Sequence, residues 1–348
     1  MRVERILPGA HPPASLVGSV LTRDLVAGGE RMAKGRRLSA DDLAALIADP
    51  AAVGDGVTVL VLEAGDVHED DAALSLAAAV GGPGLTTRGP AQSRVDLVAA
   101  VDGVLHVRTA ALERVNRIDP LEVFTAFDGS VVRAGQLVAS VKVAPHVVGE
   151  AILDAGRRQA GFGRRPIVRV APFLARRVGV VVREAIHSLA RERFESSVAA
   201  KVTGLGSTLV GISYAAADEA VEDAMTAFAS GPHRVDVILT AGGGSTDPHD
   251  PFFGAVAALG GEVVRHGVPA HPGSMLWLGK IGRVAILGLP TCGAYSKATA
   301  ADLVLPRLLT GERPGPRLVS GLGHGGLLTR DQRFRFPAYA RELDAPDG

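Results

Sequence analysis

The sequence predicts an α/β fold, with a parallel sheet in its second half and a mixed α+β region before it. Three observations lead to this prediction: strand and helix patterns alternate after residue 166, hydrophobic residues make up 47% of the chain, and aromatic residues make up only 4%. The core must therefore consist mainly of Val, Leu, Ala and Ile, which suits an α/β protein. At 348 residues the chain is long enough for about two domains.

The first region, residues 1–165, combines helix and strand patterns. Ser39 is a suitable N-cap for a helix, because two aspartates follow it in the first turn. An apolar run over 57–62 predicts a buried strand, and the segment 69–80 predicts a helix. Residues 130–145 alternate polar and apolar side chains around a central glycine, which predicts a β-hairpin.

A glycine- and arginine-rich segment, residues 156–165, interrupts the apolar pattern and is the candidate linker to a second domain over 166–312. Residues 313–348 form a C-terminal tail. Strands that alternate with helices predict parallel β-α-β units with right-handed crossovers in the second domain. The predicted strands include 167–171 or 178–182, 208–214 and 235–240, and the predicted helices are 185–200, 217–229, 252–259 and 295–309.

The composition argues against several classes of partner and site. Thirty-seven basic residues balance thirty-seven acidic ones, so no overall field attracts nucleic acid or an anionic membrane. The single cysteine, Cys292, excludes an internal disulfide and any multi-cysteine metal site. Neither a signal-like N-terminus nor an apolar run of about 18 residues occurs, so we expect a soluble, cytoplasmic protein.

The strongest local signal is the segment 235–250, VDVILTAGGGSTDPHD, in which an apolar strand runs directly into three glycines and a serine. In an open parallel sheet such a loop lies at the carboxyl end of a strand, where ligands bind. Gly242, Gly243 and Gly244 allow backbone N–H groups to approach an anion, and Ser245 adds a hydroxyl donor. The alternative is a tight turn between a strand and a helix.

Two carboxylates lie on the same loop. Asp247 and Asp250 flank a proline and a histidine, and carboxylates beside a phosphate site can hold Mg²⁺. The alternative is structural: Asp250 caps the following helix, and Asp247 opens a turn with Pro248.

The order of these motifs resembles the molybdopterin-binding domain shared by molybdopterin molybdotransferases, molybdopterin adenylyltransferases and gephyrin. The resemblance lies in LTAGGGS at 239–245, LGGEVVRHGVPAHPG at 259–273 and GRVAILGLPTCGAYSKA at 282–298. It covers roughly residues 175–312 and implies a three-layer domain on a parallel sheet. A weaker likeness at 34–43 widens it to molybdotransferase-like proteins.

The resemblance implies a set of functional residues. Asp250 falls on the family's functional aspartate and is the candidate catalytic residue, and Asp247 and Asp250 are the candidate Mg²⁺ ligands. The implied ligand is molybdopterin or adenylylated molybdopterin, with molybdate as a second substrate and a homo-oligomer as the assembly. The candidate binding residues are Thr240, Gly242, Gly243, Gly244, Ser245, Pro272, Gly273, Ser274, Pro290 and Thr291.

The sequence also departs from the family pattern. Ser274 replaces the lysine of a P-G-K-P turn, and Thr291 to Gly293 replace the end of a G-L-P-G-N-P loop. Arg183 and Glu184 stand where the family has a T-G-D-E-L turn, although Asp218 matches an aspartate usual before a helix. Binding is therefore better supported than catalysis.

Three functions stay open on the sequence. The first is a molybdopterin-binding protein of cofactor biosynthesis, which would insert molybdate into adenylylated molybdopterin if it is catalytic. The second is a sensor or delivery protein that has kept the fold and lost turnover. The third is another α/β enzyme for a phosphate ligand. Cys292 is either a site residue or, as the favoured alternative, a buried apolar thiol. His324 is either a site residue or, as the favoured alternative, part of a turn in the tail.

Overall fold

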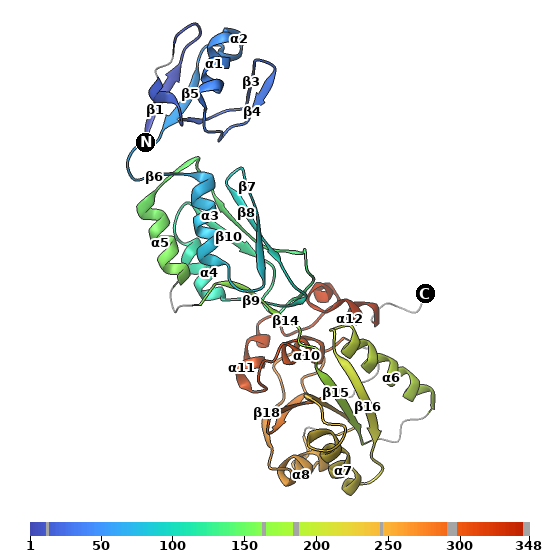
Figure 1. The fold of residues 1–348 in the computed structure, drawn as a ribbon. Coiled ribbons are helices and arrows are strands. Elements are labelled where there is room, and N and C mark those ends of the chain that lie inside the picture. Colours follow the sequence, from blue (N-terminus) through green and yellow to red (C-terminus); the bar gives the residue numbers. More distant parts are fainter. Residues whose placement is uncertain (12–13, 162–164, 184–187, 244–245, 291–297, 344–348) are drawn as a thin grey trace. The chain divides into compact units, whose positions relative to one another are not determined.

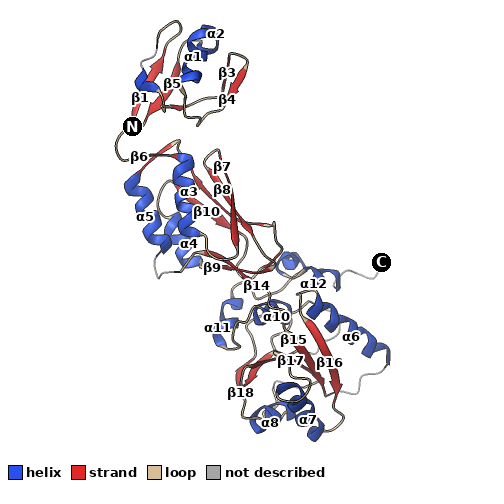
Figure 2. Ribbon diagram, viewed as in Figure 1, coloured by secondary structure: helices blue, strands red, loops and turns tan. Residues whose placement is uncertain are grey.

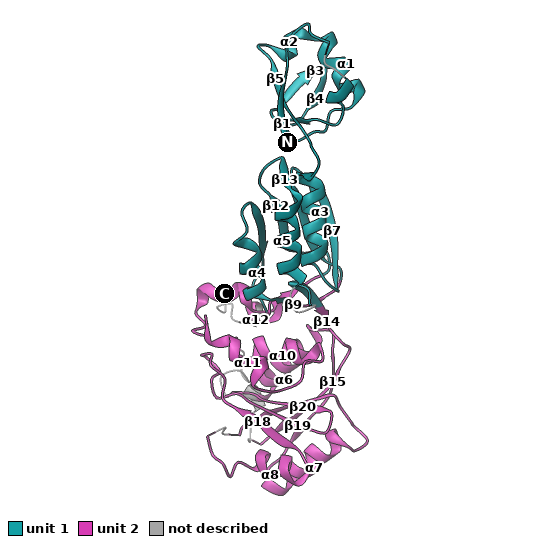
Figure 3. Cartoon of the chain, turned by 90° about the vertical axis from the view of Figure 1, so that its left-hand side faces the viewer, with its two compact units in different colours: residues 1–100, 106–128, 134–170 teal, residues 101–105, 129–133, 171–348 magenta. Residues whose placement is uncertain are grey.

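The computed structural model describes residues 1–11, 14–161, 165–183, 188–243, 246–290 and 298–343 (Figure 1). The chain divides into two compact units, each assembled from more than one stretch of sequence (Figure 3). Unit 1 contains residues 1–100, 106–128 and 134–170, and unit 2 contains residues 101–105, 129–133 and 171–348. Among the described residues, no helix is both long and apolar enough to cross a membrane.

The N-terminal part of unit 1 is a small sheet covered by a helix. The sheet has the order β1-β5-β2 and is antiparallel, and β3 pairs with β4 beside it. Ser39 caps α1 in a reciprocal capping box with Asp42, as the sequence predicts for the cap. The elements are β1 (Arg2–Ile6), β2 (Val20–Leu21), β3 (Leu25–Ala27), β4 (Glu30–Met32), α1 (Ala40–Ala48), α2 (Pro50–Val53) and β5 (Val57–Val61).

The rest of unit 1 is a four-stranded antiparallel sheet, in the order β10-β12-β8-β7, with helices on one face (Figure 2). Helix α3 packs on β8 and β12, and α5 packs on α3. The elements that follow β5 as far as β14 are β6 (Asp66–His68), α3 (Glu69–Val80), β7 (Leu85–Ala91), β8 (Arg94–Ala99), β9 (Gly103–Val107), α4 (Thr109–Asn116), β10 (Leu121–Thr125), β11 (Val131–Val132), β12 (Leu137–Val143), β13 (Val147–Gly149), α5 (Glu150–Gly161) and β14 (Val168–Pro172).

Unit 2 is built on a six-stranded sheet in the order β16-β15-β17-β20-β19-β18. The first four strands in this order are parallel, and β19 and β18 add an antiparallel edge. The largely parallel sheet confirms the predicted α/β class. The elements are β15 (Arg177–Val182), α6 (Ser188–Thr203), β16 (Thr208–Tyr214), α7 (Asp218–Ala229), β17 (Val237–Ala241), α8 (Pro251–Ala258), β18 (Glu262–His266), β19 (Trp277–Ile281), β20 (Val284–Gly288), α10 (Ala301–Leu309), α11 (Pro316–Val319) and α12 (Ala338–Leu343).

Alternate residues of the central strands face two separate cores, which makes the unit three-layered. On β17, Val237 and Leu239 join a core with α6 and α10, whereas Ile238 joins a core with α7 and α8. Strands β15 and β20 alternate in the same way. Leu318 and Phe336 of the predicted tail are also buried in the first of these cores.

The parallel strands contain a topological switch point. The chain visits β15, β16 and β17 in that order, yet β15 lies between the other two. The connections that follow β15 and β16 therefore run in opposite directions across the sheet, and the switch point lies at the carboxyl ends of β15 and β17, where ligands of such sheets bind. The glycine-rich segment after β17 begins at this switch point.

Two local predictions in the first region are wrong. Residues 156–161 of the predicted linker belong to helix α5, in which Gly156 provides room for the side chain of Leu121. Residues 130–145 do not form a hairpin, because β11 pairs with β9 while β12 pairs with β8 and β10. The domain boundaries at 165 and 312 stay a prediction.

Candidate ligand-binding site

The segment between β17 and α8, residues 242–250, is called the glycine loop here. Thr240 is buried near the end of β17, and its carbonyl accepts a hydrogen bond from the N–H of Leu289 at 2.8 Å. Gly242 then has φ +82, a backbone conformation that favours glycine. The loop therefore turns away from the sheet directly at the switch point.

Gly243 is required by a close approach within the loop. A Cβ at this position would lie 2.7 Å from the ring of Phe252 and 2.9 Å from Oδ2 of Asp250. Phe252 lies in the first turn of α8, and its ring is fully buried against the sheet. The ring therefore cannot move aside at low cost. The loop backbone and the first turn of α8 thus form one closely packed element.

Both aspartates of the loop have structural roles. Asp250 is buried and caps α8, its Oδ1 accepting a hydrogen bond from the N–H of Phe252 at 2.9 Å. Oδ1 of exposed Asp247 accepts from the N–H of His249 at 2.8 Å. No group of three His, Cys, Asp or Glu side chains among the described residues could hold a metal ion. Contact of Asp247 and Asp250 with Mg²⁺ stays a prediction, since this ion commonly takes one or two carboxylates together with phosphate oxygens.

Arg183 and Asp218, two residues that the sequence comparison names but does not connect, form an ion pair at the same edge of the sheet. Arg183 follows β15, and its N–H donates to the carbonyl of Ala241 at 3.0 Å. Its guanidinium donates from Nε to Oδ1 of Asp218, the first residue of α7, at 3.0 Å. Both side chains are solvent-accessible, 35% and 62% respectively. The switch point therefore carries a cation that an anionic ligand can reach.

The predicted P-G turn, residues 272–274, lies against the start of α10. The Pro272 carbonyl accepts from the N–H of Ala300 at 2.9 Å, and a Cβ on Gly273 would lie 2.8 Å from that same nitrogen. Gly273 has φ +104, and the Ser274 carbonyl accepts from Val268 at 2.9 Å. The turn is therefore fixed by backbone contacts that need a glycine.

The remaining candidates are only partly described. Pro290 is buried one residue beyond the Leu289 to Thr240 hydrogen bond, which brings it beside the start of the glycine loop. Gly244, Ser245, Thr291 and Cys292 lie outside the described residues. His324 is exposed, while the nearby Gly326 packs against the carbonyl of Pro269.

A small cavity of about 250 Å³ lies beside the P-G turn and was not predicted from the sequence. Pro272 and Ala298 line it together with Arg330 and Arg333, which come from the C-terminal residues. The arginine-rich segment RDQRFR could have indicated a positively charged site. Nothing in the sequence, however, connects that segment to residue 272.

The domain that carries the glycine loop is similar to a known protein family. Residues 178–310 match the family model of the probable molybdopterin binding domain. The matched residues run from β15 to α10, so this molybdopterin-binding domain contains the glycine loop, the P-G turn and Pro290. The fold and the motif order thus point to the same domain.

Two solved structures are similar to the chain. The molybdopterin biosynthesis enzyme MoaB of Thermus thermophilus has 20% identity over 40% of this chain and 98% of that chain, with a TM-score of 0.29. The molybdopterin biosynthesis MoeA protein of Pyrococcus horikoshii has 13% identity over 73% of this chain and 80% of that chain, with a TM-score of 0.29. No curated protein matches the chain. The molybdopterin-binding domain is therefore assigned from the family model.

Proposed function

We propose that the chain acts in molybdenum-cofactor biosynthesis and binds molybdopterin, or adenylylated molybdopterin, at the switch point of its molybdopterin-binding domain. The observation that carries the proposal is the glycine loop: it follows β17 at the switch point, inside the matched residues 178–310. Ligands of open parallel sheets bind at this position.

The loop would hold the phosphate end of the ligand. Backbone N–H groups of Gly242 to Gly244 and the hydroxyl of Ser245 are the proposed donors, and the N-terminus of the eight-residue helix α8 adds a favourable dipole. Asp250 fixes the loop against that helix. Arg183 supplies a nearby positive charge. In the family motif a lysine of the P-G-K-P turn has this position, but Ser274 replaces it here.

The other candidates would contact the pterin side. Thr240 and Pro290 lie beside the start of the loop. The turn of Pro272, Gly273 and Ser274 is held against α10, and Thr291 is the remaining candidate of this group. Asp247 and Asp250 would be the carboxylate ligands if Mg²⁺ accompanies the phosphate, and each also accepts a backbone hydrogen bond through Oδ1.

Binding is tested by titrating purified full-length protein with molybdopterin. Gly243→Val should weaken binding strongly, because the new side chain meets Phe252 and Asp250. Asp250→Ala removes the helix cap, whereas Asp250→Asn keeps a cap acceptor and removes the charge. Asp49→Ala is the matched control, since it removes the N-cap of α2 in unit 1. Tight binding by Gly243→Val and Asp250→Ala alike would contradict the site.

Turnover is a separate question within the proposal. A molybdotransferase would release AMP from adenylylated molybdopterin only when molybdate is present, while a binding or delivery protein would release none. Measuring molybdate-dependent AMP with wild type and Arg183→Ala separates the two, because loss of this cation should reduce AMP release if the switch point is the catalytic site. Retention of a nucleotide and never of a pterin would favour a different phosphate-ligand enzyme.

A further inference from the structure

A second polar cavity lies in unit 1, outside the molybdopterin-binding domain. It measures about 460 Å³, and its lining residues come from three neighbouring strands of the four-stranded sheet. Arg88 belongs to β7, Arg94 and Asp96 belong to β8, and Lys142 belongs to β12. The cavity is within the range of small-molecule sites, about 300 to 1,000 Å³.

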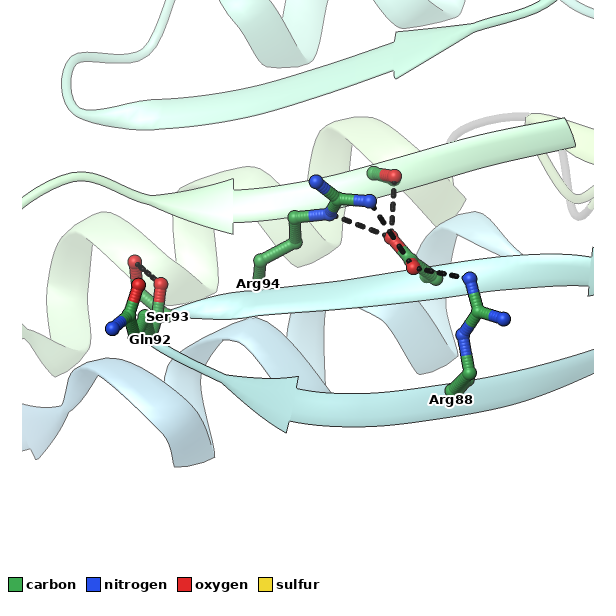
Figure 4. A network of polar contacts seen from close by, with 6 residues as sticks. Arg88, Gln92, Ser93 and Arg94 are labelled. Atoms are coloured by element: carbon green, nitrogen blue, oxygen red, sulfur yellow. Dashed lines mark hydrogen bonds and ion pairs between the residues drawn. The ribbon is translucent and has the colours of Figure 1, made fainter. Parts of the chain in front are cut away.

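One carboxylate orients two guanidinium groups at this cavity. Asp96 accepts from Arg94 Nε at 2.7 Å and from Arg88 at 3.0 Å, and the Ser140 hydroxyl donates to it at 2.7 Å (Figure 4). The Asp96 side chain is 11% exposed, whereas those of Arg88 and Arg94 are 66% and 46% exposed. The two guanidinium groups are thus held in place from below while the rest of each group faces solvent.

The third cation stands between a like charge and an opposite one. Among the described residues, Lys142 forms no ion pair or hydrogen bond through its ammonium; it lies directly opposite Arg94 in the β8 to β12 pairing and directly opposite Glu122 in the β10 to β12 pairing. Like charges directly opposite each other destabilise a sheet. Three positive charges stand against the two negative charges of Asp96 and Glu122, which leaves a net local charge of one positive unit. A bound anion would relieve this repulsion.

The turn that closes the cavity is held in an uncommon backbone conformation. Gln92 has φ 50 and Ser93 has φ 63, although neither is glycine. Ser93 is buried, and its N–H donates to Oδ1 of Asp70 on α3 at 3.1 Å. Positive φ at both central residues is the geometry of a common two-residue hairpin turn, and this turn joins β7 to β8 next to the Ala91 to Arg94 pair. Figure 4 shows both residues at the end of the strand that carries Arg94.

We propose that this cavity is a binding site for the phosphate group of a small organic phosphate. Guanidinium forks match the geometry of phosphate oxygens, and an ammonium adds a point charge. A phosphate monoester carries a charge of about −1.5 to −2 at neutral pH, which is opposite in sign to the local excess. The cavity is larger than one phosphate ion needs, so the ligand has an organic part that lies beside Gln92 and Gly89.

The test is calorimetric titration of full-length protein at low salt with inorganic phosphate, pyrophosphate and AMP. AMP should bind, and Lys142→Met and Arg88→Ala should each weaken it by about tenfold or more, as expected for a lost charge-assisted contact. Arg31→Ala is the matched control, because Arg31 is an exposed arginine of unit 1 that is also paired with an aspartate. Gly243→Val should leave this binding unchanged, which separates it from the molybdopterin site.

A stability measurement keeps the proposal independent of misfolding. Lys142→Met removes both the repulsion by Arg94 and the attraction of Glu122, so its thermal unfolding temperature should stay close to that of wild type while its AMP affinity falls. Equal AMP affinity in wild type and Lys142→Met would overturn the proposal. Absence of binding for all three probes at millimolar concentration would also overturn the proposed phosphate site. Equal affinity for phosphate and AMP would contradict the inference that the ligand has an organic part.

Discussion

Lys201 and Asp302 form an ion pair inside the apolar core of unit 2. The Nζ to Oδ1 distance is 2.5 Å, and the side chains are 1% and 0% exposed. Oδ2 of Asp302 also accepts from the N–H of Thr299, and the Lys201 ammonium lies 5.5 Å from the centre of the Tyr339 ring. Removing one partner from such a pair leaves a buried charge without its counter-charge.

We expect Lys201→Met to lower the free energy of unfolding by about 3 to 5 kcal/mol. The double variant Lys201→Met/Asp302→Asn should recover much of this loss, because the asparagine is neutral and still accepts from Thr299. Urea unfolding of the single and double variants measures the difference. A double variant whose loss equals the sum of both single losses would show that the two charges are not coupled.

One carboxylate, Asp96, gives unit 1 a pH-dependent stability. Hydrogen bonds from Arg94, and then from Ser140 and Arg88, hold the pKa of Asp96 well below its usual value of 3.8. Because the folded pKa lies below the unfolded one, the carboxylate stabilises the protein above about pH 4, and this contribution is lost as the pH falls further. Asp96→Asn should therefore be less stable than wild type at neutral pH.

The difference between the two proteins should shrink as the solution is acidified below about pH 4, because the Asp96 carboxyl of the unfolded chain then takes up a proton while that of the folded protein stays ionised. Chemical unfolding at several pH values measures it. A difference that stays constant down to the acid limit would mean that the ionised carboxylate is not what stabilises the network.

Single residues of the glycine loop were predictable from the sequence, but their reasons were not. The run Gly242 to Gly244 indicated a backbone that approaches something closely, and Asp250 indicated either a cap or a metal ligand. The structure supplies a capping role for Asp250 and a packing reason for Gly243. Ligand contact by either residue stays a prediction, because contacts of a side chain depend on segments far away in the sequence.

At the scale of elements, strong apolar patterns were predictive and glycine-rich segments were misleading. Strand β5, helix α3 and strand β17 appear within a residue or two of their predicted bounds, since each carries its own hydrophobic pattern. Helix α5 was missed because its glycines and arginines look like a linker. The β11 to β12 hairpin was wrong because the choice of pairing partner is a long-range property.

Two glycines of α5 test this explanation within one helix. Gly156→Ala should destabilise the protein by about 1 to 3 kcal/mol, because the added Cβ overpacks the core beside Leu121. Gly161→Ala has no atom within 4 Å of the new Cβ and should be neutral or slightly stabilising. Thermal unfolding of both variants makes the comparison. A stabilising Gly156→Ala would show that Leu121 moves aside at little cost.

At the scale of the whole molecule, unit 2 depends on two short stretches that come early in the chain. Val131 packs against its larger core, and Arg133 forms an ion pair with Asp102 at 2.7 Å and also donates to the carbonyl of Gly204. Both stretches belong to unit 2, although residues 134–170 of unit 1 separate them from the rest of it. Residues 171–348 alone are therefore an incomplete unit.

We expect the fragment 171–348 to unfold at a lower temperature than unit 2 does in the full chain, and to bind more of a dye that reports exposed apolar surface. Val131→Ser in the full chain should move the transition in the same direction by a smaller amount, since it removes only one of the lost contacts. An identical transition in the fragment and the full chain would mean that the two early stretches contribute nothing to stability.

The interleaved chain also bears on how such a protein can diversify. A single genetic crossover between codons 134 and 171 would deliver the molybdopterin-binding domain from a related gene, but residues 101–105 and 129–133 would still come from the recipient. The imported half would then meet foreign partners at Val131 and Arg133. Recombination of this half as an independent domain is therefore disfavoured. Substitutions in these two stretches should accumulate together with substitutions in the residues of unit 2 that they contact.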